Sequence, residues 1–79
     1  MFFVYILQSQ SDKSYYTGFT EDLQKRLKEH NQGGVTYTSS KRPFEIVWHC
    51  CFKDKSKAIA FEKYLKSGSG IAFSRKRFL

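Results

Sequence analysis

The chain has 79 residues, so it is long enough for one domain, residues 1–79, and too short for two. Its apolar fraction of 41% excludes a disordered tail, and we expect neither a membrane span, which needs ~20 apolar residues, nor an export signal. The net charge of +7 lies entirely in residues 41–79, which favours a polyanionic partner such as nucleic acid over a surface that is basic only for solubility.

Two strands are predicted in the first 20 residues. Phe2 to Leu7 is a nearly continuous run of aromatic and branched residues, which suits a buried strand. A polar turn follows, and Tyr15 to Phe19 reads as a second strand, so the pair is expected to form a hairpin. Gly18 indicates a bulge or a close approach of the backbone to another group near the end of that strand.

A helix is predicted after the hairpin. Thr20 is a candidate N-cap, because acidic residues follow it where the first turn of a helix favours them. The helix is expected to run to about Asn31 and to end at Gly33 and Gly34. Residues 35–43 are expected to form an exposed loop with a basic end.

The second half predicts one more strand and two more helices. Phe44 to Phe52 is again aromatic and branched, as in a strand, and Asp54 begins a helix that runs to about Lys66. The Ser67–Gly70 stretch is expected to break this helix before a short helix with a basic face from Ile71 to Phe78. The order β-β-α-β-α-α predicts a small α/β (α+β) sandwich, because three strands need helices over at least one face.

The two cysteines, Cys50 and Cys51, are adjacent in the sequence. Neighbouring residues cannot staple a small fold, so we expect no disulfide framework and a reducing cytoplasm as the compartment. Their spacing also does not match a zinc site. His49 beside Cys50 suggests a thiol nucleophile, but adjacent residues of a strand face opposite ways, which argues against that interpretation.

Glu62 interrupts the apolar face of the predicted helix that begins at Asp54. At 100° per residue, Glu62 falls within the arc that Phe61 and Leu65 help to define. A carboxylate in that position is costly unless it is paired or binds a cation. Two interpretations follow: Glu62 is a cation ligand, or it lies at the rim and pairs with Lys66 four residues later.

Four more polar groups lie on the elements that cover the same sheet. Arg26 and His30 are four residues apart and flank the leucine stripe of their helix, so their charged ends can meet. Tyr5 and Tyr16 lie on strands that are predicted to pair, so both hydroxyls can reach one surface. Each group also has a simpler explanation: a snorkelling arginine, a histidine at a helix C-terminus, and tyrosines that only pack.

The spacing of these residues resembles the GIY-YIG nuclease superfamily. Val4-Tyr5-Ile6 corresponds to the first motif, with a valine in place of its glycine, and Tyr16-Thr17-Gly18 corresponds to the second. The likeness is greatest to the small stand-alone bacterial members, and it covers essentially the whole chain, including the ending 61–78. The positions that match the remaining functional residues of the family are Arg26, His30 and Glu62.

The resemblance implies a central three-stranded antiparallel sheet flanked by helices, and a phosphodiesterase that uses one divalent metal, Mg²⁺ or Mn²⁺. It implies that Tyr5 activates the attacking water and that Tyr16 assists it or hydrogen-bonds the phosphate. Arg26 would bind the scissile phosphate, His30 would support the proton network, and Glu62 would hold the metal. A phenol, with an ordinary pKa of about 10, needs a nearby cation to act as a base, and Arg26 and the metal are candidates.

The family's asparagine near the C-terminal end of the domain is absent, because the only asparagine of this chain is Asn31. The C-terminal stretch has Ser74 followed by three cations instead. The group that holds the far side of the phosphate, and with it the efficiency of cleavage, is therefore left open.

The sequence thus predicts a metal-dependent endonuclease that acts on DNA, with branched, nicked and single-stranded DNA as candidate substrates and with no membrane partner. The alternative is a nucleic-acid-binding module that retains the fold and cleaves weakly or not at all. The basic second half supports both, and the oligomeric state is not predicted. The residues expected to bind nucleic acid are Lys41, Arg42, Lys66, Arg75, Lys76 and Arg77.

Overall fold

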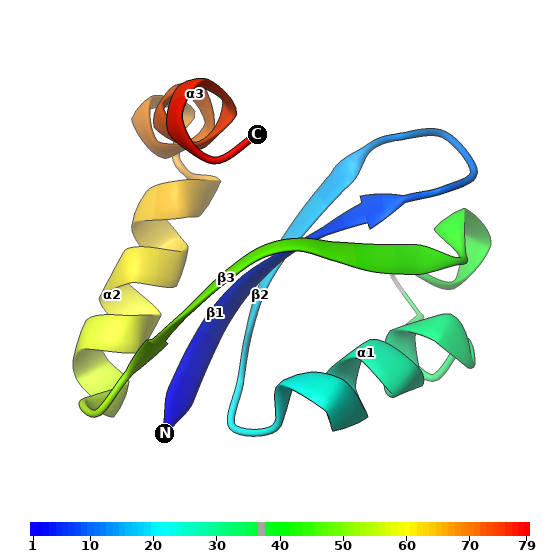
Figure 1. Cartoon of the computed structure of the whole chain (residues 1–79), viewed down its shortest axis with the longest axis horizontal. Coiled ribbons are helices and arrows are strands. Elements are labelled where there is room, and N and C mark those ends of the chain that lie inside the picture. The colour runs from blue at the N-terminus through cyan, green and yellow to red at the C-terminus, as the bar shows by residue number, and fades with distance from the viewer. Residues whose placement is uncertain (37) are drawn as a thin grey trace.

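The computed structural model describes residues 1–36 and 38–79. Strands β1, β2 and β3 form one antiparallel sheet in the order β2-β1-β3, with three α-helices packed around it (Figure 1). This arrangement confirms the predicted fold class and element order. The elements are β1 (Phe2–Ser9), β2 (Tyr15–Thr20), α1 (Leu23–Asn31), the 3₁₀ turn η1 (Ser39–Lys41), β3 (Phe44–Phe52), α2 (Lys55–Lys66) and α3 (Gly68–Arg77).

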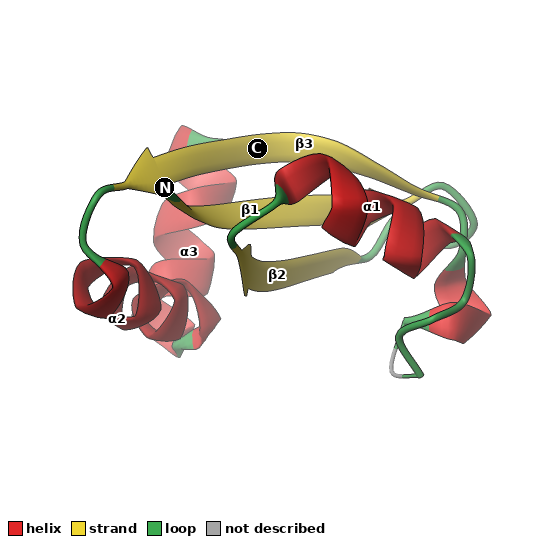
Figure 2. Cartoon of the chain, turned by 90° about the horizontal axis from the view of Figure 1, so that it is seen from below, coloured by secondary structure: helices red, strands yellow, loops and turns green. Residues whose placement is uncertain are grey.

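The central strand β1 divides its side chains between the two faces of the sheet. Val4 and Ile6 pack in a cluster with α2, whereas Tyr5 and Leu7 pack in a second cluster with α1. Figure 1 shows α1 and α2 on opposite sides of the sheet, and Figure 2 shows α1 in front of the strands with α3 behind them. Because alternate residues of a strand point to opposite faces, one short apolar run supplies both clusters.

Aromatic rings fill the space between the sheet and the α2 side. The ring of Trp48 on β3 stacks on Phe78, with centroids 4.1 Å apart and planes 7° apart. Ala58 and Leu65 of α2 are fully buried against the same cluster. These contacts hold α2 and α3 against one half of the sheet.

Three local features differ from the sequence-based predictions. Helix α1 is capped by Asp22, whose side chain accepts a hydrogen bond from the Lys25 amide at 3.1 Å, and not by Thr20. Asp22 takes the cap because its carboxylate reaches an amide in the first turn of the helix, where the Thr20 hydroxyl bonds instead to the backbone of Asp22. The predicted loop at residues 35–43 contains the turn η1, and its residue Tyr37 lies outside the described part of the chain.

The third difference is the start of α3, which begins at Gly68 and not at Ile71. The side chain of Ser67 accepts a hydrogen bond from the Gly70 amide at 3.2 Å and so caps the helix. Gly70 lies so close to the backbone carbonyl of Tyr64 that a Cβ atom there would collide with it. The glycines of this stretch therefore allow two helices to meet tightly, although their composition is typical of a loop.

Across residues 1–36 and 38–79, no helix combines the length and the apolar character that a membrane crossing requires.

Candidate active site

Tyr5 lies on the central strand, and its phenol extends across the edge strand. Its pairing partner in β2 is Gly18, and a Cβ atom at Gly18 would collide with the hydroxyl and ring of Tyr5. The prediction of a close approach at Gly18 is therefore confirmed, with the group that approaches it being a side chain. The Tyr5 side chain is only 1% exposed, and its hydroxyl lies 3.1 Å from Nε2 of His30.

His30 lies in the last turn of α1 and is completely buried. Both of its ring nitrogens face side chains: Nε2 faces the Tyr5 hydroxyl at 3.1 Å, and Nδ1 faces Thr38 Oγ1 at 2.7 Å. Interaction with the helix C-terminus alone does not require this burial, so the simpler explanation for His30 is incomplete. The three side chains form a buried hydrogen-bonded chain from the sheet to the segment after α1.

Thr38 is the member of this chain that sequence reasoning missed. It is 1% exposed and lies just before η1, in a polar segment where threonine is unremarkable. Its oxygen lies 2.7 Å from Nδ1 of His30 and 3.4 Å from the Val35 carbonyl oxygen, to which the hydroxyl can donate. Neither periodicity nor motif spacing could identify Thr38, because its partner lies eight residues away across a helix end.

Tyr16 connects this chain to the opposite side of the sheet. Its half-buried ring lies 5.1 Å from the His30 ring, and Nζ of Lys66 lies 5.7 Å above the Tyr16 ring centre. The same Lys66 amine forms an ion pair with Glu62 at 3.2 Å. Glu62 of α2 thus reaches the edge of the sheet where α1 contributes Arg26 and His30, and its side chain is 19% exposed.

The i,i+4 ion pair that the sequence allowed for Glu62 is therefore present. It does not decide between the two interpretations of Glu62, because a carboxylate that forms an ion pair with a lysine can exchange this partner for a metal ion. What the structure adds is the position of the pair beside Tyr16.

Arg26 lies next to the phenol of Tyr5. Burial raises the pKa of Tyr5 to about 12, although a hydrogen bond and the positive charge of Arg26 oppose the rise. The negative charge of Glu62 contributes to the same rise, so Tyr5, Arg26 and Glu62 act on one another electrostatically. Arg26 in turn has a raised pKa, first because of Tyr5, and its Nη1 also pairs with Glu29 at 3.3 Å.

These environments determine the resting protonation states. Burial, and then the charge of Arg26, lower the pKa of His30, so its ring is neutral near pH 7. Tyr5 keeps its proton at the same pH, because its pKa is raised rather than lowered. A neutral imidazole nitrogen 3.1 Å from a protonated phenol is arranged to accept that proton.

Two groups of cations flank this region. Lys41 and Arg42 lie at the end of η1, where Lys41 pairs with Asp12 at 3.3 Å and Arg42 Nε donates to the Ser39 carbonyl at 2.8 Å. The second group lies on the α2 side, with Lys66 at the end of α2 and three exposed residues in the last turn of α3. Those three are Arg75, Lys76 and Arg77.

The structure also places the two residues that bear on the missing asparagine. Ser74 is buried, and its hydroxyl donates to the Ile71 carbonyl of its own helix at 3.0 Å. Asn31 binds the backbone of Phe44, accepting from its amide at 2.6 Å and donating to its carbonyl at 3.1 Å. Each of these side chains is thus engaged in holding the fold.

The described residues include no group of three or more His, Cys, Asp or Glu side chains that could enclose a metal ion. Glu62 offers a partly exposed carboxylate at the site, whereas the carboxylate of Glu29 pairs with Arg26. One carboxylate suits Mg²⁺ or Mn²⁺ held jointly by protein, water and a substrate phosphate, because Mg²⁺ keeps several waters and binds through one or two carboxylates. The donor set therefore fits a weakly held ion and does not fit an ion enclosed by protein ligands.

Comparison with known proteins identifies the family. The model of the GIY-YIG catalytic domain matches residues 1–71. The chain belongs to the GIY-YIG family. Membership in this family supports a nuclease-type function for the chain, and GIY-YIG nucleases generally use a divalent metal ion.

The relatives of this GIY-YIG chain include small UPF0213 proteins. The UPF0213 protein of Haloquadratum walsbyi is 42% identical over 66 residues, which cover 82% of this chain and 73% of that protein. The UPF0213 protein of Staphylococcus saprophyticus is 37% identical over 78 residues, which cover 98% and 88%. A solution NMR structure of the UPF0213 protein from Bacillus halodurans is 34% identical, with a TM-score of 0.59 and coverage of 99% of this chain and 87% of that one.

Proposed function

We propose that this protein is an endonuclease that hydrolyses phosphodiester bonds of DNA with the help of one divalent metal ion. The observation that carries the proposal is the buried chain of Tyr5, His30 and Thr38. This chain ends beside Arg26, at the sheet edge that Glu62 reaches from the other face. A protein that only bound DNA would have no use for a polar chain buried at this edge, because burying such groups is costly.

We assign to His30 the tautomer that carries its proton on Nδ1. In this tautomer Nδ1–H donates to Thr38, the Thr38 hydroxyl donates to Val35, and Nε2 is the acceptor for the Tyr5 proton. The attacking water gives a proton to the Tyr5 oxygen as the Tyr5 proton moves to Nε2. The hydroxide then forms the new P–O bond, the scissile P–O bond breaks, and the leaving oxygen takes a proton from solvent.

Arg26 and Tyr16 are the residues we assign to the phosphate. The Arg26 side chain is 35% exposed and its guanidinium remains charged at all relevant pH values, so it can bind two phosphate oxygens as their charge grows. Tyr16 lies between His30 and Lys66 and can donate its hydroxyl to a third oxygen. Glu62 would hold the metal ion, which when bound supplies additional positive charge at the phosphate.

The second candidate is a module that binds nucleic acid and does not cleave it. The concentration of positive charge in residues 41–79 supports both candidates equally. The missing asparagine favours the second, because the side chains of Ser74 and Asn31 are already engaged in the fold.

A cleavage assay with paired variants separates these candidates. End-labelled branched, nicked and single-stranded DNA are incubated with the protein and Mg²⁺ or Mn²⁺. We expect Glu62→Gln to lower the rate at least about 100-fold while DNA binding remains within about twofold, because the metal supplies several kcal/mol to the transition state. Glu45→Gln, an exposed glutamate on β3, is the matched control and should cleave like the wild type.

Equal cleavage by the wild type and Glu62→Gln would reveal a contaminating nuclease and overturn the proposal. Binding without cleavage of any substrate by the wild type would establish the second candidate. Thr38→Val tests the proton path: it should lower kcat about tenfold or more with KM unchanged and alter the pH–rate profile, and Thr38→Ser should restore both. A merely structural role for Thr38 would leave the profile of the folded variant unchanged.

A further inference from the structure

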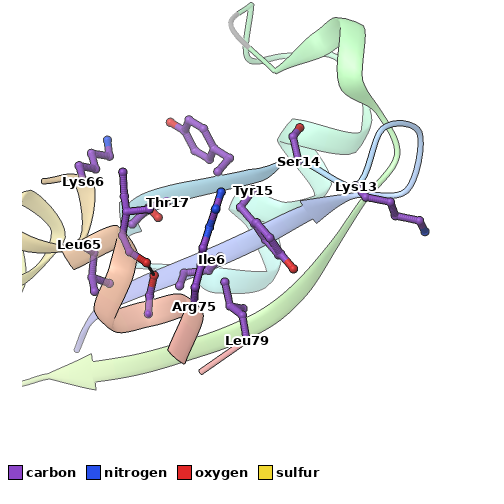
Figure 3. Close-up of a pocket in the computed structure, with 12 residues that line it drawn as sticks. Ile6, Lys13, Ser14, Tyr15, Thr17, Leu65, Lys66, Arg75 and Leu79 are labelled. Carbon is purple, nitrogen blue, oxygen red and sulfur yellow. Dashed lines mark hydrogen bonds between the residues drawn. The ribbon is translucent and has the colours of Figure 1, made fainter. Parts of the chain in front are cut away.

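A groove lies on the side of the hairpin that faces α2 and α3, away from the buried Tyr5–His30 pair. We call this hollow of about 730 Å³ the hairpin groove (Figure 3). Strands β1 and β2 form its floor, and α2 and α3 form its walls. None of the described residues that line it is acidic, whereas Glu21, Asp22 and Glu29 line a smaller hollow beside α1. The described residues that line the hairpin groove are Ile6, Lys13, Ser14, Tyr15, Tyr16, Thr17, Leu65, Lys66, Ile71, Ser74, Arg75 and Leu79.

Cations are distributed along the whole length of the hairpin groove. Lys66 lies at the α2 end, and Lys13 lies at the hairpin end (Figure 3). Between them, the side chain of Arg75 extends from α3 toward β2 and passes between Thr17 and Tyr15 (Figure 3). A series of positive charges in a hollow with no acidic lining residue is complementary to a linear polyanion.

The groove also offers apolar surface between these charges. The ring of Tyr15 is 43% exposed, and Ile71 and Leu79 across from β2 are 44% and 42% exposed. An accessible aromatic ring flanked by cations is the combination with which proteins bind single strands, because bases stack on the ring while cations contact the backbone. In paired DNA the bases are stacked on one another and cannot take up this position.

The length of the groove suits a short stretch of one strand. The residues of β2 that line it, Tyr15 to Thr17, span roughly 7 Å, which corresponds to about two stacked nucleotides at about 3.4 Å each.

The groove leads to the candidate active site. Lys66 and Tyr16 line the groove, and they also contact Glu62 and His30, respectively. We propose that the hairpin groove binds an unpaired DNA strand next to the scissile phosphate, with a base stacked on Tyr15 and a phosphate on Arg75. This inference rests on the proposed function and names its substrate class: DNA with an unpaired segment beside the cleaved bond.

The test measures binding in EDTA, so that it does not depend on cleavage. A fluorescein-labelled oligothymidine strand and a blunt duplex of equal length are titrated with protein, and anisotropy gives Kd. We expect the wild type to bind the single strand at least tenfold more tightly. Tyr15→Ala should weaken single-strand binding about 5- to 100-fold and leave duplex binding unchanged, because one stacked base is lost. Tyr15→Phe keeps the ring and should bind like the wild type.

Two matched controls accompany these variants. Tyr64→Ala removes a tyrosine of nearly equal exposure, 42% against 43% for Tyr15, on α2 outside the groove, and should have no effect on single-strand binding. Arg75→Gln should weaken single-strand binding more than Arg77→Gln, although both remove one charge from α3, because only Arg75 lines the groove.

Equal effects of Tyr15→Ala and Tyr64→Ala, or of the two arginine variants, would overturn the inference. So would equal affinity for single strand and duplex. These binding results are independent of catalysis. If the wild type shows the predicted binding and never cleaves DNA, the groove assignment stands and the proposed function is refuted. If the wild type cleaves DNA but Tyr15→Ala and Arg75→Gln bind like their controls, the proposed function stands and the groove assignment is refuted.

Discussion

The two faces of the sheet bury their residues for different purposes. On the α2 side, Val4 and Ile6 lie among apolar and aromatic side chains, and their burial stabilises the fold. On the α1 side, the neighbouring Tyr5 lies against a buried histidine, and polar atoms are satisfied pairwise. One strand of eight residues thus serves packing and chemistry at alternate positions. We therefore expect substitutions on the α2 side to lower mainly the free energy of unfolding, and substitutions on the α1 side to lower mainly cleavage.

The largest expected effect comes from the packing face. Trp48→Ala removes the ring that stacks on Phe78 and contacts Phe61, and it should lower the free energy of unfolding by about 3 kcal/mol. Cleavage per folded molecule should fall by less than in variants of Tyr5 or His30, because Trp48 packs in the cluster on the α2 side and reaches the site only through α2, which carries Glu62. Urea unfolding followed by circular dichroism gives the free energy, and Trp48→Phe is the conservative control. A loss of cleavage in fully folded Trp48→Ala would contradict the separation of the faces.

A smaller loss of stability is expected at Gly18, where the position of the Tyr5 phenol depends on the absence of a side chain. Gly18→Ala places a methyl group against the Tyr5 ring, which should cost about 1–3 kcal/mol and displace the phenol from His30. Cleavage should fall more than in Trp48→Ala, although the loss of stability is no greater. Gly68→Ala is the matched control, because no atom lies within 4 Å of the added Cβ. Wild-type cleavage by Gly18→Ala would show that the Tyr5 position is not needed.

The smallest expected effect is a pH dependence of stability that belongs to the polar face. The pKa of His30 is lowered by burial, so below its ordinary value of about 6.5 the unfolded chain binds more protons than the folded one. The free energy of unfolding should therefore fall as pH drops below about 6.5, by at most about 1.4 kcal/mol per pH unit.

This pH range distinguishes the contribution of His30 to stability from that of the carboxylates. Hydrogen bonds from Ser14 and Ser56 lower the pKa of Asp12 and Asp54, respectively, and the stability they contribute is lost only when pH falls below about 4. Urea unfolding at several pH values should show the slope in the wild type and in His49→Gln, an exposed histidine of β3, and not in His30→Gln. An identical slope in His30→Gln would assign it to another group.

The strands were predictable because they are short runs of aromatic and branched residues, and Glu62 was noticeable because it interrupts the 3.6-residue period of its helix. The break after α2 was predicted correctly, but α3 was predicted to begin at Ile71 instead of Gly68, since composition does not reveal that Gly70 meets the Tyr64 carbonyl. Thr38 and the stacking surface of Tyr15 depend on which distant elements come together. Sequence patterns describe a residue by its neighbours along the chain, and these roles are set by neighbours in space.

The crossing of Tyr5 over Gly18 also bears on how the hairpin chooses its alignment. Slipping β2 by one position would place Thr17 or Phe19 opposite Tyr5, and either would obstruct the phenol where glycine leaves it room. The correct pairing is thus favoured over its nearest competitors by steric exclusion, in addition to the burial of apolar side chains. Gly18 therefore helps to select the correct register of the hairpin as the chain folds.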